Sequence, residues 1–163
     1  MRTSTARITA DHDELGNWIA AEKAAGKTIV FANGGFDLFH VGHVRYLRAA
    51  AEEGDVLLVA INSDASIRKN KGSDRPHVPL PERMEIVASL RCVDYVTCFD
   101  TVTVADLIER LRPDVHAKGT DWNMENLPER ETLKRLGIPL AVVGDPKNHS
   151  TTEMWRQIRS KET

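Results

Sequence analysis

The sequence lacks three features that would each place it in a particular class of protein. It has no apolar run near the roughly 20 residues that a membrane-spanning helix requires. Its N-terminal stretch, MRTSTARITADHDELGNW, has no apolar core of a secretory signal. Its formal net charge of -2 differs from the strongly basic balance of nucleic-acid-binding domains. We therefore expect a cytoplasmic protein with no membrane and no nucleic-acid partner.

Cysteine is also scarce, since Cys92 and Cys98 are the two in the chain. They flank and enter an apolar segment, which favours buried reduced thiols over a disulfide or a metal-binding pair. With 163 residues, of which 41% are hydrophobic and 28% charged, the chain can bury a core without such staples. We expect one domain over residues 1–163, with 1–26 as an N-terminal helical extension and 27–160 as the core.

Hydrophobic periodicity alternates between that of strands and that of helices along the chain. Short β-branched and apolar runs predict five strands, at Thr28–Ala32, Val56–Ile61, Tyr95–Phe99, Asp114–Ala117 and Pro139–Val143. Helices are expected at Asp11–Ala25, Val41–Glu53, Pro81–Leu90, Val104–Leu111, Pro128–Leu136 and Thr151–Arg159. The stretch Ser66–His77 is polar and basic, has no apolar period and is expected to be a mobile loop or a frayed turn. This alternation predicts an α/β fold with a Rossmann-like, doubly wound parallel sheet of about five strands flanked by helices.

In such sheets, ligands bind beyond the carboxyl ends of the strands, where the winding reverses. This rule selects four loops that also carry the most unusual polar residues of the chain: Asn33–His43, Asn62–Arg75, Lys118–Asn123 and Gly144–Thr152.

Two adjacent glycines, Gly34 and Gly35, follow the first of the five predicted strands. Without a Cβ, the backbone there can approach a ligand closely, and the helix that follows offers unpaired amide groups to an anion. The spacing matches neither the dinucleotide fingerprint nor the P-loop. Taken alone, the pair is explained equally well by a strand-to-helix turn that needs glycine for steric reasons.

Two histidines favour the anion site. His40 and His43 are three residues apart in a first helical turn, so their side chains share one face, and Gly42 leaves that face open. Two imidazoles can donate hydrogen bonds to phosphate oxygens and stabilise charge that develops during phosphoryl or nucleotidyl transfer. Zinc is the alternative ligand, but a zinc site would need a third ligand, and no matching motif is present.

The stretch GGFDLFHVGH resembles the signature of the nucleotidyltransferase superfamily that carries an H-x-G-H motif after its first strand. The resemblance is closest to its cytidylyltransferase-like branch and, within it, to D-glycero-β-D-manno-heptose 1-phosphate adenylyltransferases. It extends from Lys27 to Arg159 and includes the segments VAINSDASIRKNKG, ERMEIVASLRCVDYV, PDVHAKGTDW and STTEMWRQI in order.

The resemblance implies that a sugar 1-phosphate attacks the α-phosphate of ATP and releases pyrophosphate, with Mg²⁺ as cofactor and no covalent enzyme intermediate. No activated serine or cysteine stands out in the sequence, which fits transfer by positioning and charge stabilisation. The residues implied as catalytic, through contacts with the phosphates, are His40, His43 and Lys71. Asp37 is expected to help hold the metal or fix the loop, and a helix-capping role is nearly as well supported.

The same resemblance implies a nucleotide-binding set with backbone contacts at the glycine corner, ribose and base contacts in KGTDW, and a phosphate-binding turn in STT. Its members are Asn33, Gly34, Gly35, Phe36, Asp37, Gly42, Lys118, Gly119, Asp121, Trp122, Ser150, Thr151 and Thr152. Trp122 is expected to stack on a base or on Lys118. Ser150 and Glu153 also have the spacing of a capping box, and both roles are compatible.

Four residues depart from the pattern of the heptose enzymes: Gly35, Thr120, Trp122 and His149. Because Trp122 is also common among cytidylyltransferases, the preferred base stays open between ATP and CTP.

Three further residues are assigned to substrate binding: Asp64, Arg75 and Arg83. Arg83 could instead pair with Glu82 or Asp94. Lys69, Lys71 and Arg75 form a cationic stretch that could close over a triphosphate or simply be a solvated face.

Three functions remain open at this point. They are heptose 1-phosphate adenylyl transfer, CTP-dependent transfer to glycerol 3-phosphate or another phosphorylated alcohol or phosphonate, and nucleotide binding without catalysis. The expected partners are small-molecule substrates and a second copy of the chain, since such relatives commonly dimerise. The helix at Met84–Leu90 is the candidate interface.

Overall fold

The computed structural model describes residues 6–146 and 154–156. Its sheet has six strands, all parallel, in the order β1-β4-β3-β2-β5-β6. They span Arg7–Ile8 (β1), Ile29–Gly34 (β2), Val56–Asn62 (β3), Tyr95–Phe99 (β4), Val115–Gly119 (β5) and Leu140–Val143 (β6). The predicted doubly wound parallel sheet is confirmed, with one strand more than expected. The additional strand, β1, has two residues, both exposed, which is too short for any period to predict it.

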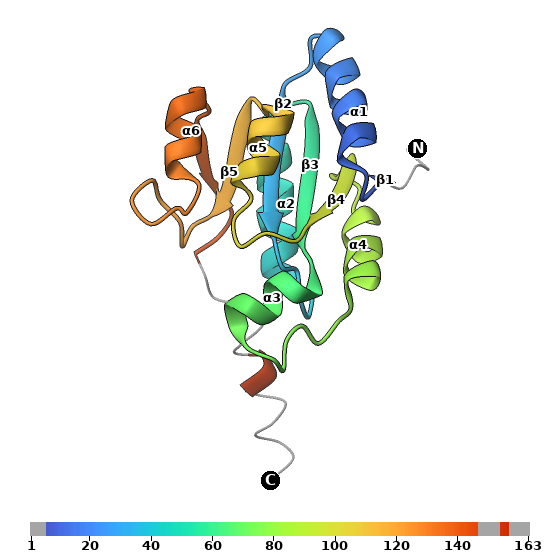
Figure 1. Cartoon of the computed structure of the whole chain (residues 1–163), viewed down its shortest axis with the longest axis vertical. Helices are drawn as coiled ribbons and strands as arrows, with labels where there is room; N and C mark the ends of the chain where they lie inside the picture. Colours follow the sequence, from blue (N-terminus) through green and yellow to red (C-terminus); the bar gives the residue numbers. More distant parts are fainter. Residues whose placement is uncertain (1–5, 147–153, 157–163) are drawn as a thin grey trace.

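Helices cover both faces of this sheet (Figure 1). They span His12–Ala24 (α1), Val41–Ala51 (α2), Asp64–Lys71 (α3), Leu80–Ala88 (α4), Ala105–Leu111 (α5) and Arg130–Leu136 (α6). Buried residues of α1, α5 and α6 join one apolar cluster, and those of α2 and α4 join another. The short helix α3 lies beyond the carboxyl end of β3, at the edge where ligands are expected (Figure 1).

The central strands β2 and β3 are continuously apolar because both of their faces are covered. Phe31 and Leu58 point to the α1, α5 and α6 side, whereas Val30 and Leu57 point to the α2 and α4 side. All four side chains are almost fully buried. The strands therefore form a rigid base from which the loops at their carboxyl ends project.

The prediction of a loop over Ser66–His77 is wrong in its first half, because α3 extends to Lys71. Ser63 caps this helix by accepting a hydrogen bond from the backbone N–H of Ser66. Ile67 is the one large apolar side chain that the helix buries. A single apolar residue produces no period, so the pattern alone could not predict the helix.

Both cysteines carry free thiols, as predicted, although Cys92 and Cys98 are only partly buried. Burial raises the pKa of each thiol above its ordinary value. Both are therefore weak nucleophiles at neutral pH.

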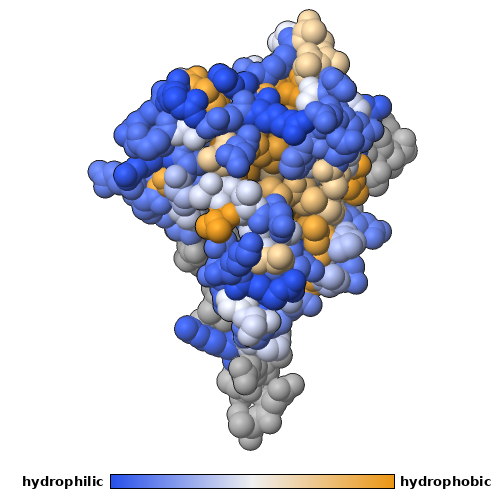
Figure 2. Space-filling model, viewed as in Figure 1, coloured by the Kyte–Doolittle hydropathy of each residue, from blue (hydrophilic) through white to orange (hydrophobic). Residues whose placement is uncertain are grey.

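None of the helices in the described part of the chain is long and apolar enough to cross a membrane. On the face drawn in Figure 2, hydrophilic side chains dominate and the hydrophobic ones form small groups.

The C-terminal segment is described only at residues 154–156, which are helical. The predictions for His149, Ser150, Thr151, Thr152 and Glu153 lie outside the described residues.

Gly54, just before β3, provides a test of the packing at the opposite edge of the sheet. A Cβ at this position would lie 2.7 Å from Val30 Cγ2 and 2.9 Å from the carbonyl oxygen of Thr28. We expect Gly54→Ala to lower the free energy of unfolding by about 1–3 kcal/mol, measured by urea denaturation. Gly16→Ala is the matched control, because nothing lies within 4 Å of its Cβ position in α1, and it should stabilise by about 0.5–1 kcal/mol. Equal effects of the two substitutions would contradict this packing.

Candidate active site

A cavity of roughly 270 Å³ opens at the carboxyl ends of β2, β5 and β6, facing the start of α2. The chain runs outward from β2 through β3 to β4 and then returns to place β5 on the other side of β2. The cavity thus lies where the winding reverses, as predicted. It brings together twelve of the residues predicted from the sequence: Asn33, Gly34, Gly35, Phe36, His40, Gly42, His43, Lys71, Lys118, Gly119, Asp121 and Trp122.

The glycine corner at the end of β2 is closely packed. A Cβ on Gly34 would meet the Phe36 ring at 3.3 Å, and one on Gly35 would meet Ile67 Cδ1 at 3.3 Å. Neither glycine needs a positive φ. Instead, the left-handed backbone falls on Phe36 (φ 50) and Leu38 (φ 41), two non-glycine residues. Such conformations cost on the order of 1–3 kcal/mol each, so surrounding contacts must hold this turn in place.

Asp37 supplies those contacts. Its buried carboxylate accepts hydrogen bonds from the backbone N–H groups of His77 and Val78 and from the guanidinium of Arg75. Burial alone would raise the pKa of Asp37, but the hydrogen bonds from Val78, His77 and Arg75 together lower it. Of its three predicted roles, Asp37 fixes the loop, and the capping role is wrong because His40 caps α2.

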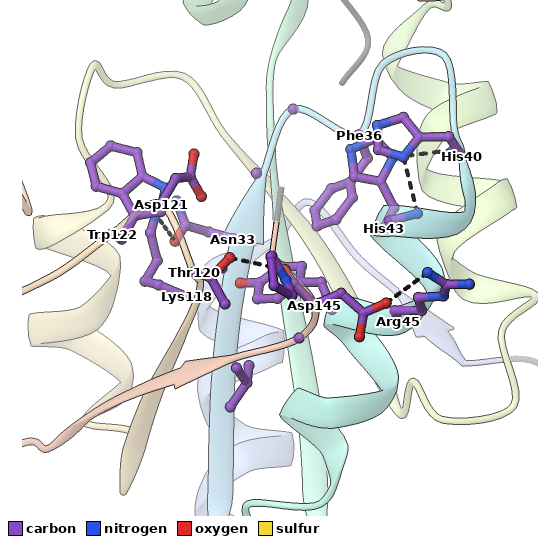
Figure 3. Close-up of a pocket in the computed structure, with 18 of the residues that line it drawn as sticks. Asn33, Phe36, His40, His43, Arg45, Lys118, Thr120, Asp121, Trp122 and Asp145 are labelled. Atoms are coloured by element: carbon purple, nitrogen blue, oxygen red, sulfur yellow. Dashed lines mark hydrogen bonds and ion pairs between the residues drawn. The ribbon is translucent and has the colours of Figure 1, made fainter. Parts of the chain in front are cut away.

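The two histidines form a reciprocal cap at the start of α2 (Figure 3). His40 Nδ1 accepts a hydrogen bond from the Gly42 N–H at 3.1 Å, and His43 Nδ1 accepts one from the His40 N–H at 3.3 Å. Their rings stack with centroids 3.9 Å apart. Because each Nδ1 is an acceptor, each ring carries its proton on Nε2. His43 therefore keeps an Nε2–H donor for a ligand, and His40 lines the same cavity beside it.

The surroundings of His43 oppose a positive charge on its ring. Burial is the main cause that lowers the pKa of His43 from 6.5 to about 3; a positive charge on His40 or Lys71 acts in the same direction, and the Asp37 carboxylate offsets the shift only in part. Phe36 and Phe39 pack beside the ring, with centroids 5.3 and 5.1 Å away. His43 is therefore a neutral hydrogen-bond donor at neutral pH.

This depressed pKa predicts a pH-dependent contribution to stability. Below pH 6.5 the unfolded chain binds a proton at His43 that the folded chain does not, so the contribution is retained above that pH and lost as pH falls towards 3. The maximal slope for one group is about 1.4 kcal/mol per pH unit. We expect urea unfolding between pH 6 and 4 to show wild type losing stability faster than His43→Asn. A constant difference between the two proteins over this range would contradict the assignment.

On the opposite side of the cavity, Lys118 is held between Asn33 and Trp122 (Figure 3). Its Nζ donates to Asn33 Oδ1 at 3.1 Å and lies 4.5 Å from the centre of the Trp122 ring. The predicted stacking of Trp122 on Lys118 is thus confirmed. Burial lowers the pKa of Lys118, while the carboxylates of Glu129 and Asp121 oppose that shift.

The three residues assigned to substrate binding lie behind the cavity wall, in ion pairs. Arg75 pairs with Asp37 at 3.2 Å, and Arg83 pairs with Asp64 at 2.5 Å. Arg83 is fully buried, so its predicted pairing with Glu82 or Asp94 is wrong. Its guanidinium also donates to the carbonyl oxygens of Gly35, Asn62 and Val78. These residues brace the glycine corner and do not line the cavity.

Lys71 alone of the predicted cationic stretch lines the cavity. Lys69 is exposed on α3 and is absent from the cavity wall.

Residues 31–161 match the sequence profile of a known family, described as cytidylyltransferase-like. The chain belongs to this family. It is 47% identical over 146 residues to the bifunctional protein HldE of Geobacter sulfurreducens, covering 90% of this chain and 30% of that protein. It is 38% identical over 162 residues to the protein of the same name from Trichlorobacter lovleyi, covering 99% of this chain and 33% of that one. The chain thus spans about a third of the length of these curated relatives.

Among solved structures, it is similar to a lipopolysaccharide core biosynthesis protein from Thermoplasma volcanium, with a TM-score of 0.62 and 26% identity. The likeness covers 74% of this chain and 100% of that one. By its family, this cytidylyltransferase-like chain is a nucleotidyltransferase, as its motifs predicted.

The cavity of this nucleotidyltransferase also contains Arg45, Tyr46 and Asp145, which the sequence analysis did not assign to the site. Arg45 of α2 forms an ion pair with Asp145 at 2.7 Å, and the Thr120 hydroxyl donates to the Asp145 carbonyl oxygen at 2.9 Å. Tyr46 donates to the carbonyl oxygen of Ala117 at 2.8 Å. Tyr46 lies three residues after His43, so the helical period could have identified it. Asp145 lies in the predicted ligand loop Gly144–Thr152, but its ion pair with Arg45 could not be predicted, because the two residues are 100 positions apart.

A dedicated magnesium site is not apparent in the described residues, where no group of three His, Cys, Asp or Glu residues could hold a metal ion. Asp37, the carboxylate suggested for this role, has both oxygens engaged by protein donors. The described residues therefore do not fit a protein-held Mg²⁺.

Proposed function

We propose that this nucleotidyltransferase joins D-glycero-β-D-manno-heptose 1-phosphate to the α-phosphate of ATP, giving ADP-heptose and pyrophosphate. The observation that carries the proposal is the stacked pair of His40 and His43, which line the cavity at the start of α2 beside the glycine corner, with the Nε2–H of His43 as a donor. The choice of substrates is supported by the resemblance of the motifs to heptose 1-phosphate adenylyltransferases. The name of the Thermoplasma volcanium protein, lipopolysaccharide core biosynthesis protein, agrees with such a pathway.

In this proposal the triphosphate lies over the N-terminus of α2, where the helix dipole favours an anion. A phosphate oxygen of the acceptor forms a bond to the α-phosphorus while the bond from that phosphorus to the bridging oxygen breaks. The electron pair leaves with pyrophosphate. His40 and His43 donate to the oxygens on which charge accumulates, and Lys71 adds a positive charge at the same wall.

No general base is required, since the acceptor phosphate is already an anion at neutral pH. This agrees with a neutral His43 that acts as a donor. Mg²⁺ is proposed to enter with ATP, held by the substrate phosphates and water, as is usual for this ion.

One observation favours a second substrate pair. Trp122 borders the cavity at the position where cytidylyltransferases often carry tryptophan, so CTP with glycerol 3-phosphate or another phosphorylated alcohol or phosphonate is the alternative.

A homodimer is proposed on resemblance alone. In the suggested interface helix α4, Met84 and Val87 pack inside this chain and Ile86 is the exposed apolar side chain.

The test is a matrix of triphosphates and acceptors, incubated with the protein and Mg²⁺, with pyrophosphate release as the readout. We expect release with ATP and heptose 1-phosphate. Release with CTP and glycerol 3-phosphate, and none with ATP and heptose 1-phosphate, would replace the first choice by the second. No release with any pair, in a protein that still binds a triphosphate, would indicate the non-catalytic function.

A further inference from the structure

A cluster of three buried ionisable side chains lies beneath the Lys118 wall of the cavity. His116 and Glu129 are almost completely excluded from solvent, and Lys118 is nearly so. His116 Nε2 lies 3.1 Å from Glu129 Oε1, and Lys118 Nζ lies 3.7 Å from the same oxygen. Glu129 itself does not border the cavity, so the proposed chemistry has not used it.

This cluster is formed by two alternate residues of strand β5 and by the residue that precedes helix α6. His116 and Lys118 are two residues apart on β5, so both project from the same face of the sheet. Glu129 immediately precedes α6, whose Leu133 packs on that face in the same apolar cluster as Phe31. Phe31 in turn stacks on His116, with ring centroids 5.5 Å apart. The carboxylate is thereby fixed below the lysine by packing from both sides.

The ionised Glu129 carboxylate forms a charge pair with Lys118, whereas the His116 ring beside it is neutral. Burial lowers the pKa of His116 despite the neighbouring carboxylate, so the ring stays neutral at pH 7. The pKa of Glu129 would be raised by burial, but His116 and Lys118 lower it, so it stays ionised.

The other groups that face Lys118 provide less negative charge to stabilise its ammonium group. Asn33 and the Trp122 ring carry no net charge, and Asp121 is exposed, where water screens its charge. Tyr46, from α2, uses its hydroxyl to donate to Ala117, and burial raises its pKa, so it stays neutral. A buried ammonium without a counter-charge tends to release its proton.

We infer that Glu129 is a positioning residue for the active site: it keeps Lys118 protonated and aimed at the cavity, opposite His40 and His43, where the ammonium binds an anionic group of a substrate. This inference rests on the proposed function, because it assigns a role to Lys118 in the same cavity. Glu129 acts through Lys118 and does not touch the substrate.

The direct test compares Glu129→Gln with the matched control Glu131→Gln. Glu131 lies two residues away and is exposed, paired with Arg130 at the surface. We expect Glu129→Gln to raise KM or the Kd of a non-hydrolysable ATP analogue by about tenfold or more, since one pKa unit corresponds to a tenfold change in protonation. Its activity should also fall as pH rises from 6 to 8.5, whereas wild type and Glu131→Gln should not show this fall. Glu129→Asp should recover part of the loss.

A second measurement keeps the inference testable if Glu129→Gln is less stable. The lysines are reductively methylated with ¹³C, the Lys118 signal is assigned by its absence in Lys118→Met, and its pKa is measured by NMR titration of the folded protein. A pKa at least one unit lower in Glu129→Gln than in wild type supports the inference. An unchanged pKa together with an unchanged pH profile overturns it. If wild type binds no triphosphate, the proposed function fails, but the NMR titration still decides whether Glu129 controls Lys118.

Discussion

Replacing His43 by alanine should lower the turnover of the nucleotidyl transfer by roughly 10²-fold or more, as expected when a preorganised donor to developing charge is lost. The structure explains why this residue should matter. Its Nδ1 is occupied by the His40 N–H, and its stacked ring is held beside Phe36 and Phe39, so the remaining Nε2–H has a fixed direction. Turnover is measured as pyrophosphate release at saturating substrates.

Two controls accompany this substitution. His12→Ala removes an imidazole from α1 that contacts the Cys98 carbonyl oxygen outside the cavity, and it should leave turnover within a few-fold of wild type. Thermal unfolding of each variant separates loss of fold from loss of chemistry. A folded His43→Ala protein with near-normal turnover would refute the role assigned to the histidine pair.

Replacing Arg83 by methionine should lower the free energy of unfolding by about 3–5 kcal/mol, the usual cost of removing one partner from a buried ion pair. Four acceptors lose their donor: the Asp64 carboxylate and the carbonyl oxygens of Gly35, Asn62 and Val78. These acceptors come from the glycine corner, the end of β3, the start of α3 and the segment before α4, so the shape of the cavity depends on one guanidinium.

Urea denaturation measures this loss, with Arg135→Met as the matched control. Arg135 pairs with Glu109 at the surface, so its removal should change stability by about 0.5 kcal/mol or less. A similar small change for Arg83→Met would show that the buried network does not hold the corner together.

The local sequence pattern was sufficient to predict five of the six strands and the position of the site. β4 has the predicted bounds of Tyr95–Phe99, and β3 extends the prediction by one residue, because buried parallel strands are continuously apolar. The predicted loops at the carboxyl edge line the cavity because parallel strands all end at the same edge of a sheet.

The sequence pattern was insufficient where contacts between residues far apart in the chain determine burial and pairing. Arg83 was assigned to substrate binding from its charge, yet its partners Gly35 and Asn62 lie 48 and 21 residues away and bury it. Glu129 occurs in a charged stretch that is typical of an exposed helix start, and its burial follows from contacts with β5. Helix α3 was missed because it needs only Ile67 to anchor it.

The central claim is that the histidine corner supports attack by an acceptor phosphate on the α-phosphorus of ATP. It is tested most directly with heptose 1-phosphate labelled with ¹⁸O in its phosphate group, followed by mass spectrometry of both products. We predict that all of the label is found in ADP-heptose and none in pyrophosphate. Label in pyrophosphate, or formation of ADP from ATP without a nucleotide sugar, would contradict the claim.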